Sequence, residues 1–134
     1  GEFTHKLDSK NRIMMPSEFR EDLSDEFFIT KGPENSLIIY TIEEFERQSK
    51  RLDELIIENK KNRAIKRLFF SSTVKTSLDK QGRVLLNKNL RDYAHIEGEA
   101  IIIGNNLTLE IWGVSEWQAY INEVEVNLSD IMDD

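Results

Sequence analysis

The stretch HKLDSKNRIMM, residues 5–15, occurs a second time in the chain as TSLDKQGRVLL, residues 76–86. At an offset of 71 positions Leu, Asp and Arg coincide, and three apolar residues follow the arginine in both stretches. In the same register, Phe19-Arg20-Glu21 aligns with Leu90-Arg91-Asp92. A match of this length in one order indicates an internal duplication. The chain is therefore expected to contain two copies of one structural unit.

Both copies are expected to contain the same elements. Apolar and polar residues alternate from Phe3 to Leu7, and a second short strand follows a polar turn. Asn11 in the first turn and Gly82 in the second both tolerate a left-handed backbone. Short helices are predicted over residues 17–23 and 88–94. Hairpins are predicted from strands 27–30 and 36–40 around the turn 32–35, and from strands 100–103 and 107–112 around the turn 104–106.

A helix is expected to close each copy. Thr41-x-x-Glu44 and Ser115-x-x-Gln118 both have the form of a capping box, in which side chains bind the first free backbone N–H groups of a helix. Between the copies, apolar residues at helical spacing predict a connecting helix or helix pair. Packing within the chain is favoured for this segment over a coiled coil with a partner, because its apolar pattern is short.

These patterns predict an α+β fold in a single domain, residues 1–134. Residues 1–52 form the first repeat in this interpretation, and residues 53–71 form the connecting helical segment. Residues 72–134 form the second repeat and an acidic C-terminal tail.

The composition excludes several classes of function. The chain has no cysteine, which rules out disulfides, thiolate zinc sites and a cysteine nucleophile. It contains no glycine loop for phosphate and no Gly-x-Ser-x-Gly, and His5 and His95 lack the spacing of metal ligands. We therefore expect no enzyme activity, no cofactor, no metal site and no small-molecule substrate. No apolar run approaches the roughly 18 residues of a membrane span, and no secretory signal is visible, so a cytoplasmic protein is expected.

The charges are strongly segregated along the chain. The total is −7, but residues 60–91 carry a net charge of +9, against −6 in residues 1–59 and −10 in residues 92–134. Because the local field attracts a polyanion, a basic block beside acidic segments is compatible with a nucleic-acid site. A solvated helix face is the alternative explanation, and it accounts for residues 60–67 better than for the later lysines and arginines.

The two Asp-x-x-x-Arg turns are the candidate binding elements. Asp8 and Asp79 can each accept bonds from backbone N–H groups further along the turn and so order the loop. Arg12 and Arg83 then present planar donor groups that suit a phosphate or the edge of a guanine. The alternative is an ion pair that only staples a hairpin, but two copies in matched registers favour binding. The lysines near the turns are the further candidates for contacts: Lys6, Lys10, Lys75 and Lys80.

Together these motifs resemble the MraZ family. The residues that carry the resemblance are His5-x-Leu7-Asp8-x-Lys10-x-Arg12, Phe69-Phe70-Ser71, Leu78-Asp79-x-Gln81-Gly82-Arg83 and Trp112-x-x-x-x-Trp117. The resemblance covers nearly the whole chain, and it implies two pseudo-symmetric AbrB-like swapped-hairpin β units that form one barrel-like core with flanking helices. It also implies a nucleoid-associated regulator, usually a repressor, that binds repeated double-stranded DNA elements upstream of a bacterial cell-division and cell-wall gene cluster. Several subunits are expected to assemble into a ring.

Two departures from the family pattern leave open whether the two repeats bind DNA equally. Asn11 stands where glycine is usual in the first turn. The second short helix usually begins with a proline, which Asn87-Lys88 replaces here, whereas the first short helix keeps its proline in Met15-Pro16. A different function also stays open, an AbrB-like antitoxin or interaction module whose acidic tail binds a basic protein. The acidic stretch after Arg91 is expected to face away from DNA or to pair with a neighbouring subunit.

Overall fold

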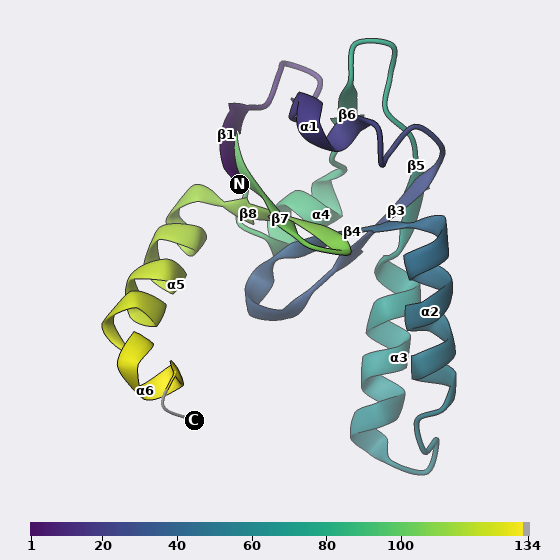
Figure 1. The fold of residues 1–134 in the computed structure, drawn as a ribbon. Helices are drawn as coiled ribbons and strands as arrows, with labels where there is room; N and C mark the ends of the chain where they lie inside the picture. The colour runs from purple at the N-terminus through teal and green to yellow at the C-terminus, as the bar shows by residue number, and fades with distance from the viewer. Residues whose placement is uncertain (133–134) are drawn as a thin grey trace.

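The secondary structure runs in two matching series in the computed structural model, which describes residues 1–132 (Figure 1). The first series is β1 (Glu2–Lys6), β2 (Arg12–Met14), α1 (Ser17–Arg20), β3 (Phe27–Lys31), β4 (Leu37–Thr41) and α2 (Ile42–Asp53). The second is β5 (Val74–Thr76), β6 (Arg83–Leu85), α4 (Lys88–Tyr93), β7 (Glu99–Asn105), β8 (Thr108–Gly113) and α5 (Val114–Val126). Helix α3 (Lys60–Ser72) connects the series, and α6 (Leu128–Met132) follows the second. The predicted order of elements is confirmed.

The main sheet interleaves the two series. Its strand order is β1-β7-β8-β4-β3-β5, with antiparallel neighbours. The first strand of each series pairs with the hairpin of the other, β1 with β7 and β5 with β3. Strands β4 and β8 join the two hairpins at the centre. Neither series completes the sheet alone, so the two are expected to fold together.

Strands β2 and β6 form a separate antiparallel ribbon, with Ile13 opposite Val84. Both residues are buried, as are Met15 and Leu86 directly after the ribbon. They pack with apolar residues of the six-stranded sheet, including the fully buried Ile111, into one core. The core thus lies between the sheet and the ribbon.

The prediction that the strands close into a barrel-like core was wrong. Among residues 1–132, the hydrogen-bonded strands form an open sheet and a two-stranded ribbon, not a closed barrel. The ribbon strands have three residues each, and a single bridge, Leu7 with Ile13, links them to β1. Such short strands have too few backbone groups to pair with both edges of the sheet.

The turn of the second hairpin differs from its predicted position. Asn105 pairs with Thr108, so β7 and β8 extend to a two-residue turn at Asn106 and Leu107, not to the expected turn at 104–106. Asn106 adopts the left-handed conformation, with φ of 61°, as such short hairpin turns require. The first hairpin was predicted correctly, and it turns through a short 3-10 segment, Pro33–Asn35.

Of the two predicted capping boxes, the structure forms only the threonine half of the first, because the Glu44 carboxylate binds Arg47 and Gln48 instead of the Thr41 N–H. Thr41 caps α2 by accepting a bond from the Glu44 N–H at 3.2 Å. Helix α5 instead begins after Gly113, and Ser115 lies inside it. A Cβ at Gly113 would lie 2.7 Å from the carbonyl oxygens of Ala94 and His95, so the close approach there excludes the threonine-type cap.

Helix α1 is shorter than predicted, ending at Arg20 rather than near residue 23. The acidic residues Glu21 and Asp22 follow directly, and negative charge is unfavourable at the C-terminal end of a helix. The predicted connecting segment is the end of α2, a short loop and α3, which is one of the two forms expected.

Aromatic residues fix the helices on the sheet. Phe45 of α2 stacks on Phe28 of β3 and on Phe69 of α3, with ring centroids 4.0 and 5.5 Å apart. Helix α5 is held by its own cluster, in which Trp117 and Tyr120 lie against Trp112 of β8. No helix in the described part of the chain is both long and apolar enough to cross a membrane.

Candidate nucleic-acid interface

The first Asp-x-x-x-Arg turn is closed by its aspartate. One carboxylate oxygen of Asp8 accepts bonds from the N–H groups of Lys10 and Arg12, both at 2.9 Å. The other accepts a bond from Nε of Arg12 at 2.8 Å. Two backbone bonds complete the loop, Asp8 N–H to Arg12 and Asn11 N–H to Asp8. Asn11 has the left-handed φ of 61° that this closure needs.

The second turn repeats this geometry bond for bond. Asp79 accepts from the N–H groups of Gln81 and Arg83 at 2.9 Å, and from Nε of Arg83 at 2.9 Å. Gly82, with φ of 82°, takes the place of Asn11. Asparagine instead of glycine in the first turn therefore leaves its hydrogen bonding unchanged.

The ribbon brings the two turns together. The N–H of Met15 donates to Gly82 O at 2.8 Å, and the N–H of Leu86 donates to Asn11 O at 3.0 Å. Each arginine consequently approaches the aspartate of the other repeat as well. Arg12 Nη1 lies 3.8 Å from Asp79 Oδ2, and Arg83 Nη1 lies 3.6 Å from Asp8 Oδ2. We call these four residues, Asp8, Arg12, Asp79 and Arg83, the paired turns.

The paired turns form one partly exposed surface. The side chains of Arg12 and Arg83 keep 28% and 24% of their surface accessible, so they lie along the aspartates and do not project freely. The ion pairs of the purely structural interpretation are therefore present. Because Nε of each arginine binds its own aspartate and Nη1 approaches the aspartate of the other repeat, Nη2 is the group left to face a ligand.

Hydrogen bonds hold both aspartates in their ionised form. The N–H of Arg12, with further bonds from Arg12 and Lys10, lowers the pKa of Asp8 below its usual 3.8, although partial burial acts in the opposite direction. The N–H of Arg83 and the bonds from Arg83 and Gln81 lower the pKa of Asp79 in the same way.

We therefore expect the stability of the fold to decrease at acidic pH. Because these pKa values are lower in the folded than in the unfolded chain, the ionised carboxylates stabilise the fold above pH 3.8, and this contribution is lost as the pH falls through the lower folded-state values. A carboxyl ¹³C NMR titration should give midpoints below 3.8 for both aspartates in the folded chain, and ordinary midpoints in unfolded peptides of residues 5–15 for Asp8 and 76–86 for Asp79. Midpoints in the folded chain at or above those of the peptides would contradict the geometry.

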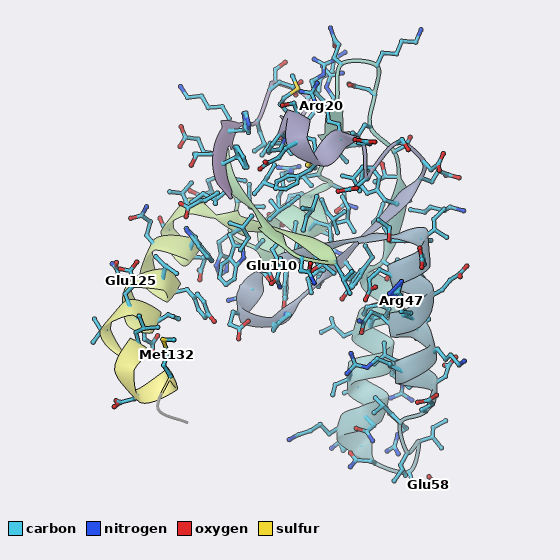
Figure 2. All side chains as sticks on the ribbon, in the orientation of Figure 1. Arg20, Arg47, Glu58, Glu110, Glu125 and Met132 are labelled. Carbon is cyan, nitrogen blue, oxygen red and sulfur yellow. The ribbon has the colours of Figure 1, made fainter. Side chains whose placement is uncertain are left out.

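A second pair of arginines was not predicted as part of the site. Nε of Arg20 donates to Met15 O and Nε of Arg91 donates to Leu86 O, both at 2.9 Å. Arg20 also lies against Gly82 of the other repeat, since a Cβ there would be 2.7 Å from its guanidinium carbon. Figure 2 shows Arg20 at the end of the molecule that carries the turns. The signal was present in the sequence, because both arginines lie at the same position in the repeat register.

The four predicted lysines do not occupy equivalent positions. Lys10 and Lys80 are exposed within the two turns. Lys6, at the end of β1, is also exposed, opposite Glu99 of β7. Lys75 lies further away on β5, where its Nζ is 3.7 Å from Glu26 and lies over the ring of Phe28.

The basic block of residues 60–91 is divided in space. Figure 1 shows α3 extending away from the sheet at the end opposite to the β1–β2 and β5–β6 loops. The five basic residues of α3 are therefore remote from the paired turns: Lys60, Lys61, Arg63, Lys66 and Arg67. Only the later part of the block contributes to the field at the turns.

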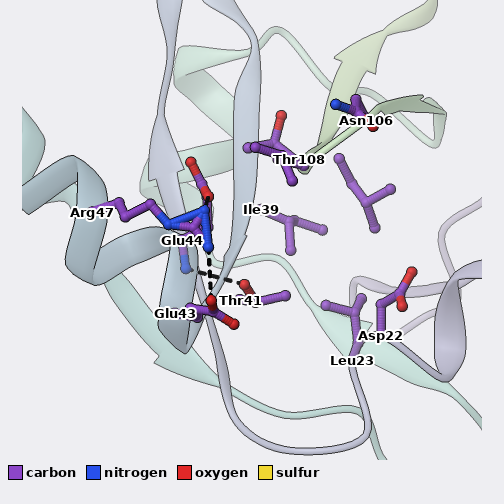
Figure 3. Close-up of a pocket in the computed structure, with 11 residues that line it drawn as sticks. Asp22, Leu23, Ile39, Thr41, Glu43, Glu44, Arg47, Asn106 and Thr108 are labelled. Atoms are coloured by element: carbon purple, nitrogen blue, oxygen red, sulfur yellow. Dashed lines mark hydrogen bonds and ion pairs between the residues drawn. The ribbon is translucent and has the colours of Figure 1, made fainter.

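A hollow of about 240 Å³ between the start of α2 and the β7–β8 turn is lined by charged and polar groups together with apolar residues such as Leu23 and Ile39 (Figure 3). The charged and polar groups bind one another. Arg47 donates to Glu44 at 2.9 Å and to Glu43 at 2.8 Å, and Glu44 also accepts from Gln48. Because these side chains already bind one another, few of their donors and acceptors are left for a ligand. The paired turns therefore remain the candidate site.

Comparison with known proteins gives one consistent result. A family model described as "MraZ protein, putative antitoxin-like" matches the chain twice, over residues 1–68 and 69–134. The chain is 45% identical over 131 residues to a protein of Clostridium acetobutylicum, covering 98% of this chain and 92% of that protein. It is 39% identical over 133 residues to a protein of Finegoldia magna, covering 99% and 93%. Both of these proteins are named transcriptional regulator MraZ.

Proposed function

This chain belongs to the MraZ family, and from that premise we propose that it is a transcriptional regulator that binds specific double-stranded DNA through the paired turns. The proposed action is repression of a bacterial cell-division and cell-wall gene cluster. The relatives' name supports the regulatory role, and the geometry of the turns supports the assignment of the binding residues.

The observation that carries the proposal is the junction of two identical arginine turns in one ribbon. Each turn fixes an arginine through its own aspartate, and the cross-repeat distances of 3.6 and 3.8 Å hold both arginines in one frame. A rigid arginine whose outer guanidinium edge still carries N–H donors suits contact with a guanine or with a phosphate. Lys10 and Lys80 would add phosphate contacts beside them. One chain thereby offers a pseudo-two-fold surface to a double helix.

Further features follow from the same proposal. We propose that the exchange of first strands between the series is the swapped-hairpin arrangement of two AbrB-like units, with residues 1–52 and 72–134 as the repeats and 53–71 as the connection. Several copies would form a ring in the cytoplasm, associated with the nucleoid, so that several paired turns meet several DNA elements. Such multivalency multiplies weak individual contacts.

The direct test is footprinting on the DNA upstream of the chain's own gene. We expect protection of short repeated elements, with a spacing that reflects more than one bound copy, and binding that weakens as salt rises. Protection that is unselective along the fragment would contradict sequence specificity. Retention of one stoichiometric basic protein in a pull-down, without retention of this DNA, would favour the antitoxin-like function instead.

A further inference from the structure

The ribbon of β2 and β6 has two faces, and only its inner face belongs to the core. Successive side chains of a strand point to opposite faces. Ile13 and Val84, the middle residues of the two strands, are buried, so the residues on either side of them lie on the outer face. We call these four residues the outer face of the ribbon: Arg12, Met14, Arg83 and Leu85. The outer face therefore combines both arginines of the paired turns with two apolar side chains.

The two apolar residues of the outer face occupy equivalent positions in the repeats. Met14 and Leu85 are 71 positions apart, and each is the middle residue of the apolar triplet that follows the arginine. Neither belongs to the hydrophobic core. Leu85 keeps 56% of its surface accessible, and Met14 is half-buried. A single exposed leucine is common on proteins, but an apolar residue in both repeats, each beside a DNA-binding arginine, indicates a role in the same contact.

Each of these apolar side chains lies beside the arginine of the other repeat. In the antiparallel register Leu85 is directly opposite Arg12, and Met14 is directly opposite Arg83. The Cβ atoms of residues paired in this way are about 5 Å apart. The outer face thus presents one unit twice, an arginine next to an apolar group, with the two units running in opposite directions.

We propose that the outer face of the ribbon lies in the major groove of DNA and that Leu85 contacts the C5 methyl group of a thymine. The inference rests on the proposed DNA-binding function and adds a residue that determines its specificity. The major groove is about 12 Å wide and admits a two-stranded β-ribbon. The thymine methyl is the apolar group that base pairs present there, and an apolar side chain recognises it by direct contact.

The dimensions of the arginine–leucine unit place the thymine close to the arginine contact. Successive nucleotides of one strand are about 3.4 Å apart along the helix axis. A side chain about 5 Å from Arg12 therefore reaches a base one or two positions from the group that this arginine binds. Phosphate contacts from lysines and arginines favour any DNA sequence, whereas contact with a methyl group favours one base. Leu85 would accordingly add selectivity without changing the salt dependence.

Replacement of thymine by uracil tests the contact, because uracil lacks the methyl group and keeps the same base pairing. In synthetic duplexes of the protected promoter element, each thymine is replaced singly, and the affinity is measured by titration. The native chain should bind about fourfold more weakly when one particular thymine is replaced, as expected for the loss of one buried methyl contact. Leu85→Ala should bind the thymine and uracil duplexes equally at that position, with the salt slope of the native chain.

Ile57→Ala is the matched control. Ile57 is 59% exposed, and it precedes Glu58, which lies at the end of the molecule opposite to Arg20 (Figure 2). This variant should keep the native affinity and the native response to uracil. Thermal melts of Leu85→Ala and Ile57→Ala should match that of the native chain, since neither side chain belongs to the core.

Two results would overturn the proposal. One is equal binding of thymine and uracil duplexes by the native chain at every position. The other is a uracil effect of the same size in Leu85→Ala, because a different group would then contact the methyl. Selective binding that depends on Arg12 and Arg83 but not on any thymine methyl would reject this inference and leave the proposed function intact. A native chain that binds no promoter DNA selectively would reject the proposed function and this contact together.

Discussion

The double substitution Arg12→Ala/Arg83→Ala is expected to abolish specific DNA binding while the chain stays folded. Each arginine that reads a base or phosphate contributes about 1–3 kcal/mol, which corresponds to roughly a fivefold to 150-fold loss of affinity per site. Both side chains lie at the surface with about a quarter of their area exposed, so their removal leaves the core of the ribbon intact. Titration of a labelled promoter fragment at several salt concentrations measures the effect. The slope of log affinity against log salt should fall by about one unit for each lost phosphate contact.

Arg51→Ala is the matched control for this experiment. Arg51 is an exposed arginine on α2, at the end of the molecule remote from the turns, and its removal changes the net charge by the same amount per site. It should leave affinity within about twofold, since distant surface charge acts only through a screened field. Native-like affinity in the Arg12/Arg83 double variant would reject these arginines as the DNA-reading residues.

Gly82→Ala is expected to have the second large effect, on the fold and on binding together. Gly82 has φ of 82°, and the left-handed conformation costs a residue with a side chain roughly 1–2 kcal/mol. The new methyl group would also overlap the Arg20 guanidinium, at 2.7 Å, and break its bond to Met15 O, which contributes about 0.5–1.5 kcal/mol. The sum of about 1.5–3.5 kcal/mol should lower Tm by about 10 °C in a thermal melt. Promoter affinity should fall as well, because Arg83 follows this turn directly.

Asn11→Gly is the matched change in the other turn and should shift stability by no more than about 0.5 kcal/mol. Asparagine already adopts the left-handed conformation there, with φ of 61°, and glycine adopts it without strain. If Gly82→Ala were as harmless as Asn11→Gly, the close contact between Arg20 and the second turn would not exist in solution.

Local patterns predicted those elements whose causes are local. The alternation of β1, the hairpin of β3 and β4, the cap at Thr41 and both Asp-x-x-x-Arg turns depend on residues within a few positions of one another. The cap predicted at Ser115 failed because Gly113 packs against the backbone of Ala94 and His95, about twenty residues away along the chain. The predicted barrel failed for a related reason, since closure depends on how strands from the two repeats meet.

For the paired turns as well, the sequence predicted the local features and only the structure showed the contacts between the repeats. The repeat register alone identified Asp8, Arg12, Asp79 and Arg83, and it predicted that each aspartate accepts bonds from backbone N–H groups of its own turn. It did not show that Arg12 would lie 3.8 Å from the aspartate of the other repeat, or that Arg20 would lie against Gly82. It also could not separate the basic residues of α3 from those near the turns.

The sequence by itself determined that two equivalent turns exist and how each is closed, because an aspartate and the N–H groups it binds are separated by two to four positions. Only the tertiary structure decided that the turns share one surface. That surface depends on the pairing of β2 with β6, which are separated by about seventy residues and are brought together by burial of Ile13 and Val84 in a common core. Such burial is non-directional, so sequence spacing alone does not specify which turn it places beside which.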